Sequence, residues 1–340
     1  MKTTVQQLSQ KLQTEEAVHF VKAEFEKHLK EQLSLIKISA PSVVLQGTGI
    51  NDDLNGIERP VGFPIKFMQE QRAEVVQSLA KWKRLRLKDY ELEAGTGIVT
   101  DMKALRPDED LGPLHSISVD QWDWEKVMSP EDRHLDFLKD QVSKIYSAIL
   151  ATEAAVAAQY PLLTPVLPAE ITFIHAEDLQ KQFPHLTPKQ REDKAVKEYG
   201  AVFLIGIGGA MEGGELHDGR APDYDDWSTP TSATTKGLNG DILVWHPILE
   251  QAFELSSMGI RVDPKTLELQ LKIRRAEDRR ELFYHSQLLE GKLPQTIGGG
   301  IGQSRMCMFL LKKQHIGEVQ ASVWPEEMRQ ELKTKGVFLL

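Results

Sequence analysis

The feature that most constrains this chain is a run of glycines close to its C-terminal end. Residues 298–300 are three consecutive glycines, Gly302 follows one residue later, and Arg305 precedes the apolar segment 306–311. Because glycine is unfavourable inside a helix or strand, we expect the run to let a backbone or a flat ligand approach where a Cβ atom would clash. Arg305 would then lie between a glycine-lined surface and a rigid element, where a guanidinium can bind a phosphate or a carboxylate.

The glycine run matches neither of the two familiar phosphate-binding loops. A P-loop needs the sequence G-x-x-x-x-G-K-[ST], and the chain contains no Gly-Lys-Ser or Gly-Lys-Thr. The dinucleotide fingerprint needs a third glycine where Gln303 stands, and it follows the first strand of its domain. Taken alone, the run fits an ordinary structural turn as well as it fits a binding surface.

The composition argues against several broad classes of protein. With 340 residues the chain can bury a substantial core, in one large domain or two small ones. Its formal net charge of -9 argues against binding dominated by nucleic-acid phosphates. The N-terminal residues lack the apolar region of a signal peptide, and no apolar run is long enough to cross a bilayer. We therefore expect a cytoplasmic protein without a nucleic-acid or membrane partner.

Cysteine and histidine usage argues against a disulfide or a zinc cluster. The only cysteine, Cys307, lies in an apolar segment and is expected to be a buried, inert thiol. The ten histidines include no HExxH sequence. Any metal would be a hard cation such as Mg²⁺, bound through carboxylates and phosphates.

Apolar periodicity predicts long amphipathic helices at 15–33 and 131–160. The first is followed by a short strand at 35–41, and this pair would suit a subunit interface as well as packing against the chain's own core. A further helix is expected from about 69 to 88, with a solvated basic face near its end. A charged helical cover at 177–198 precedes a strand buried on both faces at 201–207.

Two β-hairpins carry most of the polar residues that could form a site. In the first, 102–106 pairs with 114–125, and alternation puts Gln121 and Asp123 on one face together with His115. In the second, 241–246 pairs with 252–261. Strict alternation there puts Ser257 and Arg261 together and Glu254 opposite, so that only a bulge near Ser256 would bring all three to one face.

The loop 220–228 between these hairpins contains three carboxylates, those of Asp223, Asp225 and Asp226. Tyr224 and Trp227 lie among them, which suggests that the carboxylates are partly shielded from water. Shielding of this kind shifts carboxylate pKa values, so we favour a functional role over a simple exposed loop.

These elements together resemble the catalytic fold of the class II aminoacyl-tRNA synthetases. Arg106 and Arg305 fall where that class has its second and third signature arginines, and the segment 15–41 resembles its first signature, which builds the dimer interface. The resemblance implies an α+β fold with a central antiparallel sheet flanked by helices, and a homodimer. It also implies a single catalytic domain over residues 1–340, of which 1–14 would be a peripheral N-terminal extension.

Within that class, five segments resemble the ammonia-dependent asparagine synthetases, the aspartate–ammonia ligase family: 104–110, 119–125, 221–228, 255–261 and 298–305. The resemblance implies ATP-dependent synthesis of L-asparagine from L-aspartate and free ammonia through a β-aspartyl-adenylate, with release of AMP and pyrophosphate. Glutamine-using synthetases liberate ammonia with an N-terminal cysteine, whereas position two here is Lys2. Free ammonia is therefore the expected nitrogen donor.

The resemblance also assigns roles to individual residues. The implied catalytic groups are two arginines and two acids that match those near the ammonium, either of which could be the base: Arg106, Arg305, Asp52 and Asp225. The implied ATP site adds Asp241, Glu254, Gly298, Gly299 and Gly300, with Mg²⁺ held by Glu254 and Asp241. The implied aspartate site comprises Ser78 and Lys83 for the carboxylates, Gln121 and Asp123 for the ammonium, and Ser257 and Arg261.

Two other readings remain open at this point. One is the core of an aspartyl- or asparaginyl-tRNA synthetase, which the length of the chain and its acidic charge disfavour. The other is a catalytically silent paralogue that binds an amino acid or tRNA. The presence of Arg106, Glu254 and Arg305 disfavours that second reading.

Overall fold

One eight-stranded sheet organises the computed structural model, which describes residues 5–52, 54 and 58–340. Residues 1–4 of the predicted N-terminal extension lie outside this range. The strand order is β1-β5-β6-β11-β10-β9-β8-β7, and only the outer pairs β1/β5 and β7/β8 are parallel. The strands are β1 Leu35–Lys37, β5 Gly97–Leu105, β6 Ser118–Val127, β7 Thr172–His175, β8 Ala201–Ile205, β9 Asn239–His246, β10 Gln251–Ile260 and β11 Thr296–Gly302. The predicted α+β fold with a central antiparallel sheet is confirmed.

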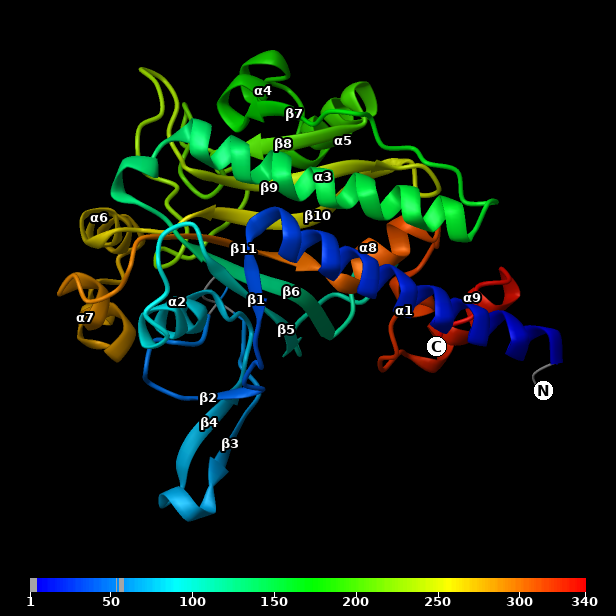
Figure 1. The fold of residues 1–340 in the computed structure, drawn as a ribbon, viewed down its shortest axis with the longest axis horizontal. Coiled ribbons are helices and arrows are strands. Elements are labelled where there is room, and N and C mark those ends of the chain that lie inside the picture. The colour runs from blue at the N-terminus through cyan, green and yellow to red at the C-terminus, as the bar shows by residue number, and fades with distance from the viewer. Residues whose placement is uncertain (1–4, 53, 55–57) are drawn as a thin grey trace.

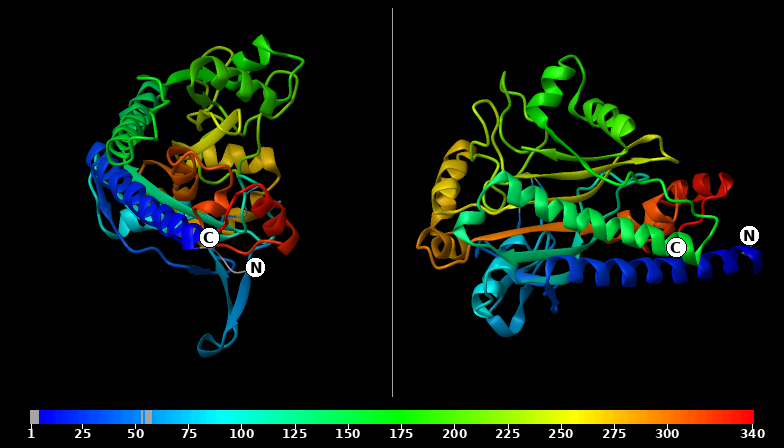
Figure 2. Two further views of the ribbon diagram at one scale, coloured as in Figure 1. Left: turned by 90° about the vertical axis from the view of Figure 1, so that its right-hand side faces the viewer. Right: turned by 45° about the horizontal axis from the view of Figure 1, so that its top comes forward.

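Two long helices cover one face of this sheet. α1 (Val5–Leu33) and α3 (Leu135–Gln159) run alongside each other, as Figures 1 and 2 show. α1 begins ten residues before the predicted start, and it buries Val21, Phe25 and Leu29 completely within the chain's own core. This inner face of α1 therefore stabilises the protomer itself.

Strict alternation along β6 separates the core from the functional face. Trp122 and Trp124 are buried in the core beneath α1, where the Trp122 ring lies 4.6 Å from that of Phe25. Gln121, Asp123 and Glu125 alternate with them and therefore point to the opposite face of the sheet. The predicted common face of Gln121 and Asp123 is confirmed.

The glycine run forms the interior of a central strand, which corrects our expectation that glycine would disfavour one. β11 is paired with β6 on one side and with β10 on the other. Neighbouring side chains occupy the space that Cβ atoms would need: a Cβ at Gly298 would overlap Glu125 Oε2, and one at Gly300 would overlap Gln121 Oε1. Hydrogen bonds on both sides stabilise a strand whose own residues must be small.

The helix predicted from about 69 to 88 is wrong in its first half. Gln71–Val75 forms strand β4, and helix α2 spans only Ala80–Asp89. β4 lies between β2 (Val43–Leu45) and β3 (Gly62–Ile65) in a second sheet that projects from the body in Figure 1. Pairing with these strands overrides the weak helical pattern of a polar segment.

The basic residues of α2 are also not solvated, contrary to expectation. Lys81, Lys83 and Arg84 are buried. Arg84 donates to the backbone carbonyls of Pro294 and Val262 at 2.8 and 2.7 Å. These cations are retained in the interior because polar partners from distant segments meet them there.

The remaining elements surround the sheet. The charged segment 177–198 forms two helices rather than one, because Thr187 and Gln190 build a capping box that starts a new helix at Pro188. The other helices are α4 Ala176–Gln182, α5 Pro188–Tyr199, α6 Pro264–Arg274, α7 Phe283–Leu289, α8 Gln303–Leu310 and α9 Glu326–Thr334. The 3₁₀ turns are Lys66–Met68, Pro130–Asp132, Glu277–Glu281 and Ile316–Glu318.

Two smaller observations bear on the predictions from composition. Within the described residues, no helix is both long enough and apolar enough to span a bilayer. Cys307 is buried as predicted, and burial raises the pKa of its thiol to about 12. A thiol with such a pKa is a poor nucleophile.

We expect Phe25→Ala to lower the free energy of unfolding by about 3–5 kcal/mol, because it leaves a cavity between α1 and the sheet. Lys27→Ala on the exposed side of the same helix should change it by less than about 0.5 kcal/mol. Chemical denaturation of both variants measures the difference. Equal stabilities would show that α1 does not stabilise the protomer.

Candidate active site

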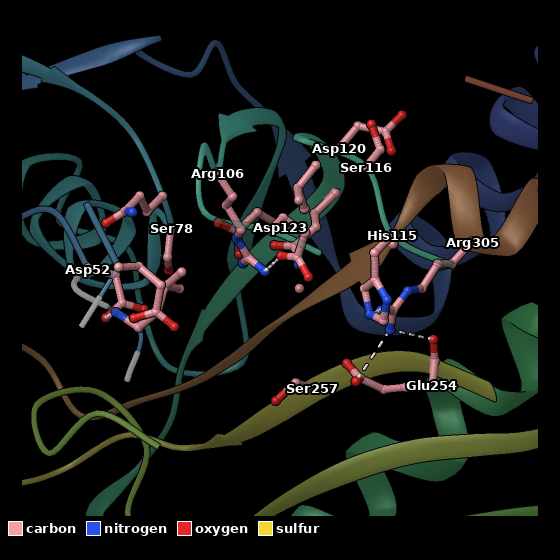
Figure 3. A pocket seen from close by; sticks show the side chains of 18 of the residues that line it. Asp52, Ser78, Arg106, His115, Ser116, Asp120, Asp123, Glu254, Ser257 and Arg305 are labelled. Atoms are coloured by element: carbon pink, nitrogen blue, oxygen red, sulfur yellow. Dashed lines mark hydrogen bonds and ion pairs between the residues drawn. The ribbon is translucent and has the colours of Figure 1, made fainter. Parts of the chain in front are cut away.

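A cavity of about 570 Å³ lies over the sheet face opposite α1 and α3. Its size is typical of a site for a small molecule. Most of the predicted site residues line it: Asp52, Ser78, Arg106, Gln121, Asp123, Asp225, Glu254, Ser257, Arg261, Gly299, Gly300 and Arg305. In Figure 3, Asp52 and Ser78 lie at one end of this cavity, and Arg305 and Glu254 lie at the other.

Lys83, Asp241 and Gly298 lie behind this wall instead of lining it. Lys83 Nζ is buried below the strands and donates to Asp123 Oδ1 and, at 2.8 Å, to the carbonyl of Trp124. The resemblance assigned Lys83 to the substrate carboxylates, but in this structure it meets a protein carboxylate.

A β-bulge in β10 brings Glu254 to the cavity. Glu254 pairs with Leu243 and Ser256 pairs with Ile242, so Leu255 is an extra residue in the register. The bulge turns Glu254 to the same face as Ser257. This is the arrangement that the sequence predicted only if a bulge occurred near Ser256.

A buried network of charges forms part of the cavity wall at its Asp123 end. Arg261 donates from Nε to Glu125 Oε1 at 3.0 Å, from Nη2 to Glu125 Oε2 at 2.8 Å, and from Nη1 to Asp225 Oδ1. Lys83 lies 3.6 Å from Glu125 Oε2 and joins this network to Asp123. Glu125 was missed by the sequence analysis, although alternation places it on the face of Gln121 and Asp123.

The network contains one more carboxylate than cations. Asp123, Glu125 and Asp225 face Lys83 and Arg261, so the buried cluster carries a formal charge of one negative unit. Burial raises the pKa of Asp225, although Arg261 opposes the shift. Burial also raises the pKa of Asp123 and lowers that of Lys83. The cluster is therefore suited to a ligand that brings a positive charge.

Two arginines, Arg106 and Arg305, line the opposite end of the cavity beside the carboxylates of Glu109 and Glu254. Arg305 Nη1 lies 3.3 Å from Glu254 Oε2, and its Nη2 donates to His115 Nε2 at 3.1 Å. Burial and the charge of Arg305 lower the pKa of His115, so the neutral imidazole can accept this bond. Arg106 is half-buried on the same wall. The sequence analysis placed His115 on the face of Gln121 but assigned it no role.

Asp241 presents an unsatisfied carboxylate oxygen behind this end. Its Oδ2 accepts from Arg220 Nη2 at 2.6 Å, whereas the buried Oδ1 has no hydrogen-bond partner among the described residues. Burial raises the pKa of Asp241 to about 7, and the nearby charge of Glu254 adds to the shift. An orphaned carboxylate oxygen near a second carboxylate fits a hard divalent cation. The sequence had given no role to Arg220, which binds Asp241 here.

The described residues contain no group of three or more His, Cys, Asp or Glu side chains that could hold a metal by themselves. A cation at Asp241 and Glu254 would therefore need further oxygen ligands, such as phosphates and water. Mg²⁺ is commonly bound in this way, through one or two carboxylates plus the phosphates of a substrate.

The loop 220–228 is shielded as predicted. Asp223, Asp225 and Asp226 are all buried, and each meets a cation: Lys81, Arg261 and Arg133, respectively. Of the three carboxylates, only Asp225 lines the main cavity.

Known sequences that resemble this chain include aspartate–ammonia ligases. The family model described as aspartate-ammonia ligase matches residues 12–336. A protein from Parabacteroides distasonis named aspartate–ammonia ligase is 57% identical over 96% of this chain and 95% of its own length. Proteins of the same name from Bacteroides fragilis and Clostridium perfringens are each 54% identical over the same shares.

Solved structures with the same fold are aminoacyl-tRNA synthetases. Asparaginyl-tRNA synthetase from Pyrococcus horikoshii, complexed with asparaginyl-adenylate, matches 92% of this chain and 70% of its own with a TM-score of 0.66 and 16% identity. The asparaginyl-tRNA synthetase from Entamoeba histolytica matches 92% of this chain and 67% of its own, with a TM-score of 0.62 and 15% identity. The chain thus belongs to the aspartate–ammonia ligase family, built on the class II aminoacyl-tRNA synthetase fold.

Proposed function

We propose that the protein makes L-asparagine from L-aspartate and free ammonia, using ATP and releasing AMP and pyrophosphate through a β-aspartyl-adenylate. The observation that carries the proposal is the polarity of the cavity, with Arg106 and Arg305 at one end and the negatively charged network of Arg261 at the other. The α-ammonium of aspartate and the phosphates of ATP need charges of opposite sign around them. The names of the relatives support the same activity.

Aspartate binds at the negatively charged end in this proposal. Its ammonium meets Gln121 and Asp123, and its α-carboxylate meets Arg261 and Ser78. Lys83 holds Asp123 in place from below, since its ammonium group is already bonded to that carboxylate. The β-carboxylate then points toward the arginines, as adenylation requires.

Adenylation brings one anion against another. A β-carboxylate oxygen forms a bond to the α-phosphorus, and the bond from that phosphorus to the leaving pyrophosphate breaks. Arg106 and Arg305 neutralise charge on the phosphates, with Arg305 oriented by His115 and Glu254. Mg²⁺ held by Glu254 and Asp241 would supply further neutralisation of the phosphates. Gly299 and Gly300 of β11 line the cavity and would contact the adenosine.

The second step needs neutral ammonia. A carboxylate takes a proton from ammonium, and the resulting ammonia attacks the β-carbonyl carbon. The bond to AMP then breaks, and the attached nitrogen loses a second proton to the departing phosphate or to water, which leaves the amide. Asp52 and Asp225 are both candidates for this base, since both are buried and both line the cavity. The raised pKa of Asp225 brings its proton affinity closer to that of the amine.

The products test the proposed function directly. Purified protein with aspartate, ammonium, ATP and Mg²⁺ should yield asparagine, AMP and pyrophosphate, measured by chromatography. Formation of ADP and phosphate would exclude the adenylate, and charging of tRNA without free asparagine would indicate a tRNA synthetase. Tight binding of aspartate without turnover would indicate a silent paralogue.

The same assay tests the roles of the arginines. Arg305→Ala should slow aspartate-dependent ATP–pyrophosphate exchange roughly 10²–10³-fold, as expected for loss of one preorganised charge donor. Arg280→Ala is the control, because Arg280 is exposed and pairs only with Glu268 among the described residues. Equal rates for both variants would contradict the phosphate role of Arg305.

Asp241 should make cation binding dependent on pH. With its pKa raised to about 7, the carboxyl is protonated below pH 7 and ionised above it. The Mg²⁺ concentration for half-maximal exchange should therefore rise as the pH falls from 8 to 6, by up to about tenfold per unit below the pKa. Asp241→Asn should remove this dependence, and the exposed Asp140→Asn should keep it. A wild-type profile in Asp241→Asn would exclude Asp241 as a cation ligand.

We also propose a homodimer formed through residues 15–41. β1 lies at the edge of the sheet, and Ile36 on it is 55% exposed. Such an edge can be covered by a second copy of the chain.

Light scattering at micromolar concentration should give twice the chain mass of 38.4 kDa. Ile36→Lys should shift the protein toward the monomer, whereas Ile273→Lys at an exposed position of α6 should not. A monomeric mass for the unmodified protein would overturn the dimer.

A further inference from the structure

A second cavity of about 220 Å³ lies beside the active-site cavity. The two share Asp52 and Gln77 in their walls. The outer wall of the second cavity includes the exposed residues Gly47 and Pro60, and its inner wall includes the buried His285. The second cavity therefore runs from the protein surface to the Asp52 end of the active site, away from Arg305 as Figure 3 shows.

Three polar atoms on residues that line this second cavity are buried and lack hydrogen-bond partners within the described part of the chain. They are Gln77 Nε2, Asp223 Oδ1 and His285 Nδ1, on side chains that are at most 1% exposed. Buried polar groups in folded proteins are almost always satisfied. Three orphaned atoms in one small cavity indicate a small polar ligand.

The chemistry of Asp223 and His285 favours a ligand that donates hydrogen bonds. Asp223 Oδ2 accepts from His285 Nε2 at 2.9 Å and from Lys81 Nζ at 3.0 Å, which leaves Oδ1 as an acceptor. Although burial raises the pKa of Asp223, Lys81 and His285 lower it below its usual range, so the carboxylate is ionised. In the tautomer in which Nε2 of His285 donates to Asp223, Nδ1 offers a lone pair.

The other lining groups agree with a small cation. Among the described residues of the wall, the three carboxylates Asp52, Glu74 and Asp223 face the two cations Lys81 and Arg279. The side-chain amide of Gln77 can present its oxygen after a flip, because its two ends are nearly identical in shape. Ammonium has four donors and no acceptor, and it fits this set of acceptors.

We propose that the second cavity binds ammonium at Asp223 Oδ1 and His285 Nδ1 and passes it by Gln77 to Asp52. The proposal rests on the proposed function, since it supplies the ammonium for the second step. Gly49 is part of the site: a Cβ atom there would lie 2.7 Å from His285 Nδ1, so a larger residue would close the cavity at the proposed binding atom.

Two variants of the full-length enzyme test this route. His285→Gln keeps a donor for Asp223 and removes the Nδ1 acceptor, and Leu282→Trp fills the cavity from its wall. Each should raise the KM for ammonium roughly tenfold to a hundredfold, the loss expected for one hydrogen bond to a charged group. Phe283→Trp, at the exposed neighbouring position, is the control and should behave as wild type.

Aspartate-dependent ATP–pyrophosphate exchange separates this proposal from the function on which it rests. Exchange reports adenylation without ammonia, so both variants should keep it within about twofold of wild type. Absence of exchange in the wild type would overturn the proposed function itself.

Wild-type exchange together with an unchanged KM for ammonium in both variants would overturn the proposed ammonium route through the second cavity. It would leave the proposed function standing. A raised KM for aspartate in place of ammonium would also exclude this route, because the cavity would then serve the amino acid. If His285→Gln fails to fold, Leu282→Trp still decides between these outcomes.

Discussion

The buried ion pair of Arg261 with Glu125 is the interaction on which the rest of the site depends. Both side chains are almost fully buried, and Thr296 donates a further hydrogen bond to Glu125 Oε1 at 2.7 Å. Removing one partner of such a pair leaves an uncompensated charge in the interior. The pair also explains Gly298, since a Cβ there would overlap Glu125 and lie 2.7 Å from Arg261 Nη2. Gly298 is thus a consequence of the charges packed against it, whereas Gly299 and Gly300 make room for Met258 and Gln121.

The arrangement of the other charged groups at this end of the active-site cavity follows from the Arg261–Glu125 pair. Arg261 fixes Asp225 with its remaining nitrogen, and Lys83 links Glu125 to Asp123. Asp123 is held by Lys83, which does not line the cavity, whereas Asp225 is held by Arg261, which lines the cavity with it. Fixed groups of this kind need little reorganisation when a charged substrate binds, which is what preorganised electrostatic catalysis requires.

The sequence predicted the two hairpins, the buried strand β8 and twelve of the residues that line the cavity, because these depend on local alternation and on segments that resemble a family. It could not predict that Gln71–Val75 is a strand, since β2 and β3 determine that by pairing. Nor could it predict that Lys81 and Lys83 are buried, because their partners Asp223 and Asp123 come from distant segments. For β10, the sequence showed only that a bulge near Ser256 would be needed to bring Glu254 to the face of Ser257 and Arg261.

The electrostatics of the main cavity give a reason for a separate ammonium route. In the proposed reaction, an ammonium ion entering past Arg106 and Arg305 would find its way obstructed by the bound nucleotide and the departing pyrophosphate. The second cavity instead meets the site at Asp52, where carboxylates predominate and where Figure 3 shows the greatest separation from Arg305. Nucleotide and ammonium would then approach the adenylate from opposite ends. With separate entry routes, the same face of the sheet can hold the arginines that stabilise the phosphates, and ammonium does not have to pass these arginines.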